Sequence, residues 1–164
     1  MTTQNQIGFI TEKIQQLQTA ILECHSNSVL KIPRSVVQTL FVDEIGCVWV
    51  GIDKPKQYIN EFDQSFHVAL NYYKKGIPFF LNTLGLARVV ADPEDISSLN
   101  PVLKEQYNNG KLILCIRIME VSYFEKQPPE VQSFLQKCQQ NISSLFVPNN
   151  EYYHFNIDHK EHYA

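Results

Sequence analysis

Long segments with the composition of β-strands, separated by short polar turns, constrain the fold of this 164-residue chain more than any other feature. Val, Ile, Leu, Phe, Tyr and Trp are concentrated in residues 30–42, 47–52, 66–73, 77–91 and 111–124, and a shorter segment of the same kind covers residues 20–24. Strands joined by tight turns pair in antiparallel fashion. We therefore expect a mainly β (α+β) fold, built on a closed or nearly closed antiparallel β-barrel.

Amphipathic patterns predict helices on both sides of this strand region. Isoleucine and leucine side chains spaced three and four apart predict a helix from about residue 6 into the high teens. A second apolar stripe predicts a helix over residues 130–147. Shorter helices are expected over residues 56–62 and from Asp92, as a capping residue, to about residue 108. The polar and aromatic tail from Pro148 shows no clear period, so we predict no element there.

Glycine and proline mark the expected turns and irregular points. The loop 43–46 ends in Gly46, which we expect in a left-handed conformation within a hairpin. Pro33 predicts an edge or a bulge early in the first long strand. Gly85 predicts the bend or bulge that a curved barrel needs.

Composition and charge bound the class of protein. The formal net charge is −3 and the sequence pI is about 5.9, whereas nucleic-acid-binding domains are usually basic. The first residues lack a positive region followed by an apolar run, and no stretch approaches the roughly 20 apolar residues of a membrane span. We expect one cytoplasmic domain over residues 1–164 that contacts neither nucleic acid nor membrane.

The four cysteines, Cys24, Cys47, Cys115 and Cys138, lie in apolar periodic segments, and none has a C-x-x-C spacing. This spacing excludes a zinc ribbon and a thioredoxin motif. Buried free thiols are favoured over disulfides, which are the alternative.

Sequence motifs of common catalytic sites are missing. The chain has no Gly-x-Gly-x-x-Gly, no phosphate-binding loop and no Gly-x-Ser-x-Gly, and we name no catalytic residue. His154, His159 and His162 crowd the tail with Asp158, and such side chains can ligate a transition metal. Their spacing matches no metal motif and chain ends are often mobile, so we predict no bound metal.

A group of cations is the most informative feature for function. Arg34 is predicted on a strand beside a hairpin whose far end reaches Lys54 and Lys56, so these cations would gather at one end of the barrel. A guanidinium can hold a phosphate with two parallel hydrogen bonds, lysine supplies a compact charge, and Ser35 can add a hydroxyl. The other interpretation is ordinary solvated surface charge, which the residues alone favour.

The order and spacing of several segments change that balance. Residues 19–24, 34–36, 46–50, 66–72 and 84–93, with Lys56 opening a short helix, together resemble the pyridoxamine-5′-phosphate-oxidase-like superfamily of FMN-binding split barrels, in its general stress protein branch. The likeness spans roughly residues 7–124. It implies a split β-barrel with FMN at a homodimer interface. It also implies an oxidoreductase activity, with the small-molecule substrate and the electron donor unknown.

The resemblance also implies which residues contact the cofactor. Arg34, Ser35 and Lys56 would approach the phosphate and the ribityl chain. Val36 and Val37 would pass their backbone along the flavin ring. The remaining implied contacts are Val50, Gly51 and Ile52 at the other edge of the ring, with Lys54 as a weaker candidate.

The chain departs from the family pattern at two places. The family commonly has Thr or Ser near the end of the tryptophan-bearing strand, where this chain has Ile52 and Asp53, and an aspartate repels a phosphate. The C-terminal Arg-Leu-x-Pro-like substrate motif of pyridoxamine phosphate oxidases is absent. The alternative function is a non-catalytic split-barrel protein that holds heme or another ligand, or acts in stress sensing.

Because that substrate motif is absent, we predict that the FMN-loaded protein does not efficiently oxidise pyridoxamine phosphate or pyridoxine phosphate in air. The measurement is the formation of pyridoxal phosphate over time. Robust turnover of either compound would contradict the prediction.

Overall fold

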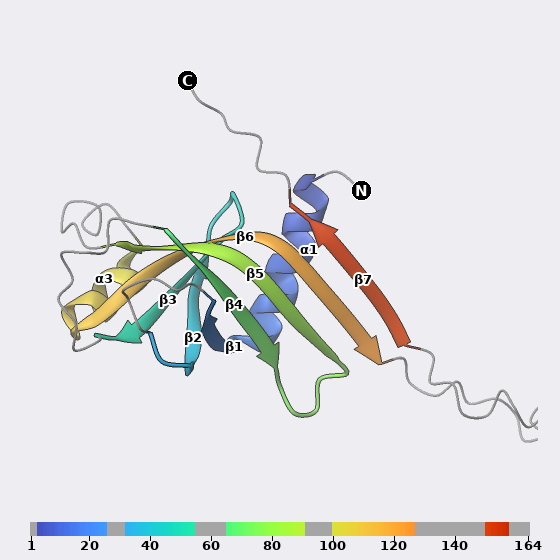
Figure 1. Cartoon of the computed structure of the whole chain (residues 1–164), viewed down its shortest axis with the longest axis horizontal. Coiled ribbons are helices and arrows are strands. Elements are labelled where there is room, and N and C mark those ends of the chain that lie inside the picture. Colours follow the sequence, from blue (N-terminus) through green and yellow to red (C-terminus); the bar gives the residue numbers. More distant parts are fainter. Residues whose placement is uncertain (1–2, 26–31, 55–64, 91–99, 127–149, 158–164) are drawn as a thin grey trace, which may run out of the picture.

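The computed structural model describes residues 3–25, 32–54, 65–90, 100–126 and 150–157. These residues form two helices and seven strands, which are labelled in Figure 1. The helices are α1 (Thr3–Leu17) and α3 (Pro101–Asn108). The strands are β1 (Thr19–Cys24), β2 (Ser35–Val42), β3 (Cys47–Asp53), β4 (Phe66–Tyr73), β5 (Phe79–Val90), β6 (Lys111–Lys126) and β7 (Asn150–Asn156).

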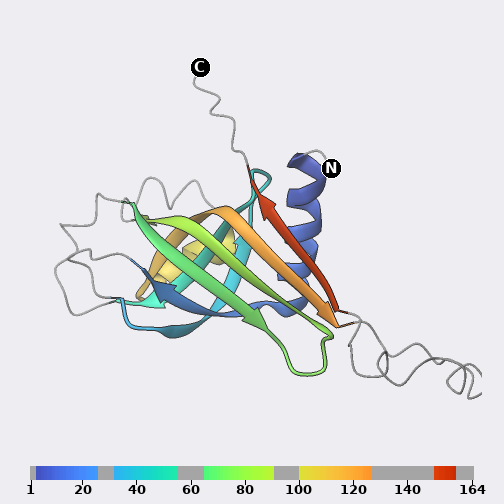
Figure 2. The same ribbon diagram turned by 45° about the vertical axis from the view of Figure 1, so that its right-hand side comes forward.

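Six of the strands close an antiparallel barrel, and the seventh lies outside it. The strand order is β3-β2-β1-β4-β5-β6-β7, and β3 also pairs with β6. The first part of β6, Lys111–Arg117, pairs with β3, whereas its last part, Glu120–Lys126, pairs with β7. β6 therefore leaves the barrel seam halfway along its length and carries β7 beside α1 (Figures 1 and 2). The predicted split barrel with flanking helices is confirmed.

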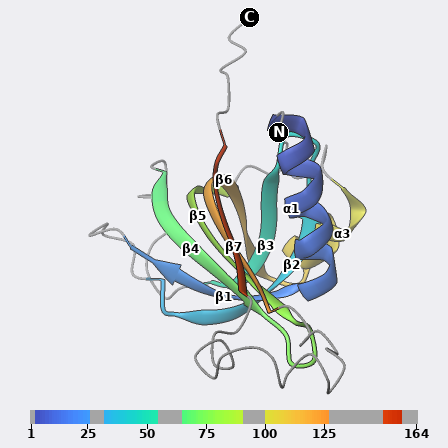
Figure 3. The ribbon, with the colours of Figure 1, turned by 90° about the vertical axis from the view of Figure 1, so that its right-hand side faces the viewer.

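Alternate residues of the strands fill the interior of the barrel. Leu22, Leu70, Leu81 and Leu114 are completely buried in one apolar cluster. The buried face of α1 joins the same cluster through Ile10, Ile14 and Leu17. The apolar stripe in the sequence therefore marks the face that α1 packs against the barrel, beside its opening (Figure 3).

A second, smaller apolar cluster lies on the outside of the barrel, where α3 packs on β2, β3 and β6. It contains Leu103 of α3 together with Cys47, Trp49 and Cys115, whose positions alternate with the inward residues of their strands. α3 thereby covers the outer side of the β3–β6 seam. Val90 at the end of β5 also belongs to this cluster, whereas no described residue of β1 or β4 does.

The irregular points predicted from glycine are confirmed. Gly46 has φ +82° in the turn between β2 and β3. The pairing of β5 with β6 shifts between Leu84 and Gly85. Leu84 pairs with Glu120 and Gly85 pairs with Ile118, so no residue of β5 lies opposite Met119. A Cβ atom at Gly85 would lie 2.5 Å from the backbone oxygen of Arg117. Only glycine therefore fits this crossing without a shift of backbone.

Two predicted boundaries are wrong, and proline explains both. The first long strand was expected from residue 30, but residues 32–34 are not strand and β2 begins at Ser35. Pro33 lacks a backbone N–H and therefore cannot donate to a ladder. For the same reason β5 begins at Phe79, directly after Pro78, and not at residue 77.

The other expectations for local structure have different outcomes. α3 confirms the predicted helix end at residue 108, but the expected continuous helix from Asp92 is wrong, because α3 begins at Pro101. Asn100 caps α3 by accepting a hydrogen bond from the Val102 N–H at 3.0 Å. Asp92 and the predicted helices over 56–62 and 130–147 lie outside the described residues. β7 is a strand that the sequence did not predict. Within the described chain, neither helix is long and apolar enough to cross a membrane.

We expect Gly85→Ala to lower the free energy of unfolding by roughly 1–3 kcal/mol, because the added methyl group meets a backbone oxygen that cannot rotate away. Urea denaturation measures the change. Gly8→Ala is the matched control. Nothing lies within 4 Å of a Cβ at this helical position, and the substitution should stabilise the protein by about 0.5–1 kcal/mol. Equal effects of the two substitutions would contradict the close packing at Gly85.

Candidate functional site

The antiparallel registers of four neighbouring strands align polar side chains on the outside of the barrel. One row runs from Glu23 through Ala69 and Leu84 to Glu120, with each residue opposite the next across the ladder. Directly opposite residues share one face of a sheet. These side chains therefore form a continuous surface that faces away from the core.

A second row lies beside the first, two residues along each strand. It joins Asn71 of β4, Asn82 of β5 and Ser122 of β6. The hydroxyl of Ser122 lies 3.3 Å from the hydroxyl of Tyr152 and 3.2 Å from Nδ1 of His154, both on β7. The row is therefore continued onto β7 by hydrogen bonds.

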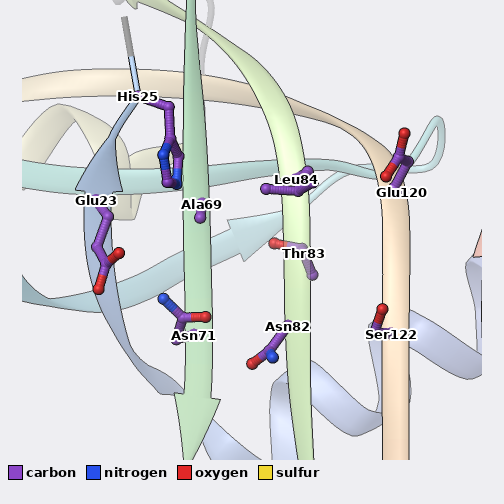
Figure 4. A pocket seen from close by; sticks show the side chains of 9 residues that line it. All are labelled: Glu23, His25, Ala69, Asn71, Asn82, Thr83, Leu84, Glu120 and Ser122. Atoms are coloured by element: carbon purple, nitrogen blue, oxygen red, sulfur yellow. The ribbon is translucent and has the colours of Figure 1, made fainter. Parts of the chain in front are cut away.

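A cavity of about 320 Å³ lies over these two rows, and we call it the outer-face pocket. Figure 4 shows its side chains on four strands, with Glu23 on the β1 side and Glu120 on the β6 side. Its lining residues are Glu23, His25, Ala69, Asn71, Asn82, Thr83, Leu84, Glu120 and Ser122.

The two carboxylates of the pocket have different surroundings. The carboxylate of Glu23 forms an ion pair with the guanidinium of Arg34 at 2.7 Å. The side chain of Glu23 is 28% exposed and that of Arg34 is 69% exposed. Within the described part of the chain, Glu120 has no ion-pair partner. Arg34 therefore neutralises one end of the pocket and leaves the other end negative.

Most of the cofactor residues inferred from the resemblance lie on β2 or β3, whereas Arg34 directly precedes β2 and Lys54 directly follows β3. Because these strands are antiparallel, the start of β2 and the end of β3 lie at the same end of their hairpin. Val36 is 72% exposed on the outer side, while Val37, Val50 and Ile52 are buried in the barrel core. These three buried side chains face the barrel interior, so only their backbone could meet a ligand outside the barrel.

The other residues at this end have contacts with different elements. A Cβ atom at Gly51 would meet Leu40 at 3.5 Å and Lys111 at 3.6 Å, so the outer side of Gly51 is covered. The ammonium of Lys54 lies 5.9 Å from the ring centre of Tyr107 on α3. Ser35 is half-buried at the start of β2, and Lys56 lies outside the described residues. The structure thus brings Arg34 to Glu23 and Lys54 to α3.

Asp53, the residue expected to repel a phosphate, has a cationic partner. Its carboxylate accepts a hydrogen bond from the ammonium of Lys111 at 2.6 Å. Both side chains are on the surface, where such pairs contribute little to stability. The ammonium of Lys111 nevertheless places a positive charge beside the Asp53 carboxylate. It therefore weakens the repulsion between this carboxylate and a nearby phosphate.

The cysteines that the structure describes, Cys24, Cys47 and Cys115, are in the thiol form, and Cys138 lies outside the described residues. A hydrogen bond between Cys47 and Cys115, together with burial, raises the pKa of the Cys47 thiol. The same hydrogen bond lowers the pKa of Cys115 against the effect of burial, and Arg88 contributes to the lowering. The two thiols lie under α3, away from the outer-face pocket.

One further buried group has a shifted pKa. Burial raises the pKa of Tyr72, and the hydrogen bond between the hydroxyls of Tyr72 and Thr39, at 2.8 Å, opposes that shift. The tyrosine hydroxyl lies inside the barrel and stays protonated there. No group of three or more His, Cys, Asp or Glu side chains in the described residues could hold a metal ion. His159 and His162 lie outside them.

Sequence reasoning missed the outer-face pocket entirely. One signal was available, because Asn71 and Asn82 lie in the middle of strand segments and asparagine is depleted in strands. Their pairing opposite each other depends on register, which the strand pattern alone did not supply.

No family model and no curated protein matches the chain. Solved structures do match. The general stress FMN/FAD binding protein of Xanthomonas citri aligns at 19% identity and a TM-score of 0.55, covering 80% of this chain and 95% of that one. A protein from Clostridium acetobutylicum, related to general stress protein 26 of B. subtilis in the pyridoxinephosphate oxidase family, aligns at 10% identity, a TM-score of 0.56, and 76% and 91% coverage.

A general stress protein 26 from Jannaschia sp. CCS1 aligns over 93% of this chain and 98% of its own, with a TM-score of 0.60 and 10% identity. This chain has the fold of the general stress split barrels. The resemblance seen in the sequence is confirmed at the level of fold. At identities of 10–19%, these structural alignments show a shared fold alone.

Proposed function

We propose that this chain binds FMN on the outer side of its barrel and serves as an FMN-dependent oxidoreductase of unknown substrate. The observation that supports this most directly is the exposed guanidinium of Arg34 at the start of β2, on a barrel with the fold of an FMN/FAD-binding protein. A planar guanidinium has five N–H donors, so one edge can bind Glu23 while another binds a phosphate.

The residues around Arg34 fit a flavin in part. Val36 is exposed two residues farther along β2 and gives the apolar surface that a flat ring needs. Ser35 adds a hydroxyl, and Lys54 lies at the same end of the hairpin. Glu23 competes with a phosphate for Arg34, which sets a limit on affinity. The fit is adequate for noncovalent binding with the phosphate at this end and the ring over the outer side of β2.

The protein and the cofactor would have separate roles. Bound FMN supplies transfer of one or two electrons. Arg34 and Ser35 hold the phosphate end, Lys56 is proposed to join them, and the backbone of β2 orients the ring. No described side chain is assigned as an acid or a base. Trp49 is not available for stacking, because it is buried beneath α3 and its indole N–H donates to Asp43 at 3.1 Å.

We also propose that two copies associate through the outer sides of β1, β4, β5 and β6. Large apolar side chains are exposed there, including Tyr73, Phe80 and Leu84 at 68%, 36% and 46%. The rings of Phe80 and Phe124 stack at 4.8 Å and extend this surface across two strands. Exposed apolar side chains gathered on one face are typical of an interaction site. A dimer formed this way would enclose the outer-face pocket between subunits.

If Arg34 holds the phosphate, Arg34→Ala should weaken FMN binding by about tenfold or more, since a hydrogen bond to a charged group contributes roughly 1.5–3 kcal/mol. Fluorescence titration of FMN into the flavin-free protein measures the dissociation constant. Lys56→Ala should act in the same direction. Riboflavin lacks the phosphate, so its affinity should differ much less between the variants and the parent.

Lys104→Ala removes an exposed lysine from α3 and is the control, which should leave FMN affinity unchanged. Unchanged FMN affinity in the Arg34 variant would place the cofactor elsewhere. A visible absorption spectrum of the purified protein distinguishes bound FMN from heme, the alternative ligand. Flavin has two bands in the near ultraviolet and blue, whereas heme has one intense band near the violet.

Added FMN should also raise the melting temperature of the dimer, because a ligand that binds only the folded state stabilises it by mass action. Differential scanning calorimetry at matched protein concentration measures the rise, and Arg34→Ala should reduce it. Gel filtration of the same samples measures the oligomeric state. A monomer with bound FMN would contradict the proposed interface while leaving the phosphate contact standing.

A further inference from the structure

We propose that the outer-face pocket binds a small planar organic cation, such as an amidinium or a protonated aromatic amine. The assignment of this cation as the substrate class rests on the proposed flavin function. Its binding does not, because the pocket lies over β1, β4, β5 and β6, whereas the described flavin contacts lie on β2 and β3 or directly beside them.

The charge of the pocket selects a cation. Glu23 and Glu120 are the carboxylates among its lining residues, and no lysine or arginine is among them. Arg34 pairs with Glu23 from the neighbouring strand, and the carboxylate of Glu120 has no cationic partner among the residues that the structure describes. Even with Arg34 counted, one negative charge is left over. An anionic group would be repelled at the β6 end, and a cation would be attracted there.

The floor of the pocket suits a flat molecule. Ala69 and Leu84 lie opposite each other between the two glutamates, so the centre of this row is apolar and has one very small side chain. Three strand spacings separate β1 from β6, a span of roughly 14 Å. A single aromatic ring with a charged substituent is shorter than this span. It can therefore rest on the floor with its charge at Glu120.

Hydrogen-bonding groups lie along one side of this floor. Asn71 and Asn82 are opposite each other, and Figure 4 shows their amides close together in the pocket. Neither amide has a hydrogen-bond partner among the described side chains and backbone. Each can donate and accept, so they suit the edge of a ligand that carries N–H groups. The outer-face pocket thus combines an apolar floor, two amides that can bind a ligand, and one carboxylate more than the cations that neutralise it.

The position of the pocket connects it with the proposed flavin site. Glu23 lines the pocket and also binds Arg34, the residue proposed to hold the phosphate. The β1 end of the pocket therefore lies next to β2, the strand over which the flavin ring is proposed to lie. The carboxylate of Glu120 binds the cation and takes no part in a catalytic step.

The test uses three probes of the same shape and different charge. Benzamidine is cationic, benzamide is neutral and benzoate is anionic. Each is titrated into the flavin-free full-length protein and followed by the side-chain amide signals of Asn71 and Asn82 in ¹H–¹⁵N NMR spectra. We expect benzamidine to bind most tightly, benzamide more weakly and benzoate least, with the largest shifts at these two amides.

Glu120→Gln keeps the size of the side chain and removes its charge. It should weaken benzamidine binding by about tenfold, because a charge-assisted hydrogen bond becomes a neutral one, and leave benzamide nearly unchanged. Glu105→Gln, at an exposed position on α3, is the control and should alter neither affinity. Urea denaturation of each variant verifies that folding is retained.

Benzoate binding as tightly as benzamidine, shifts confined to residues outside the pocket, or no binding of any probe would overturn the proposal. An unchanged benzamidine affinity in Glu120→Gln would also overturn it. FMN titration of the same samples is a separate measurement. Failure of FMN to bind while benzamidine still does would reject the flavin function and leave the cation site standing.

Discussion

The pairing of β3 with β6 is the constraint on which the rest of the structure depends. This ladder runs without a shift from Cys47–Arg117 to Asp53–Lys111 and turns a sheet into a closed barrel. Closure gives every strand residue either an inner or an outer position, because neighbouring side chains alternate between the two sides. The inner positions hold the main core. The outer positions along the seam are protected by α3, and those farther away remain available to a ligand or a partner.

β6 links the closed barrel to the outer-face pocket. Its first half completes the seam with β3, and its second half supports β7 and supplies Glu120 and Ser122. The change between these two functions occurs where the ladder with β5 shifts at Gly85. The close approach of the two backbones at this point requires the missing side chain of glycine. One residue without a Cβ thus allows a single strand to serve both the core and the candidate site.

Features set by local sequence could be predicted, and features set by register could not. The apolar stripe of α1, the turn at Gly46 and the irregularity at Gly85 each depend on a few neighbouring residues. The pocket depends on strands whose residues are far apart in the chain, so that Glu23 and Glu120 meet the same cavity. A shift of one residue in any ladder would move these side chains to the other face.

The same distinction explains β7 and the cations. β7 lies in a short aromatic tail that has no clear period, and its pairing with the end of β6 is what makes it a strand. Arg34 was expected on a strand but directly precedes β2, and its ion pair with Glu23 depends on the ladder between β1 and β2. Composition showed which charged side chains exist, and topology decided which of them meet.

The seam between β3 and β6 also has a consequence for how the chain reaches its fold. The paired residues are separated by 58 positions at Asp53–Lys111 (111 − 53) and by 70 at Cys47–Arg117 (117 − 47). Contacts of such long sequence separation slow folding, because the intervening chain must be ordered before they form. During synthesis the hairpin of β2 and β3 must wait with an open edge until Arg117 has left the ribosome. An unpaired edge invites pairing with another chain, so this interval is when the protein is most prone to aggregate.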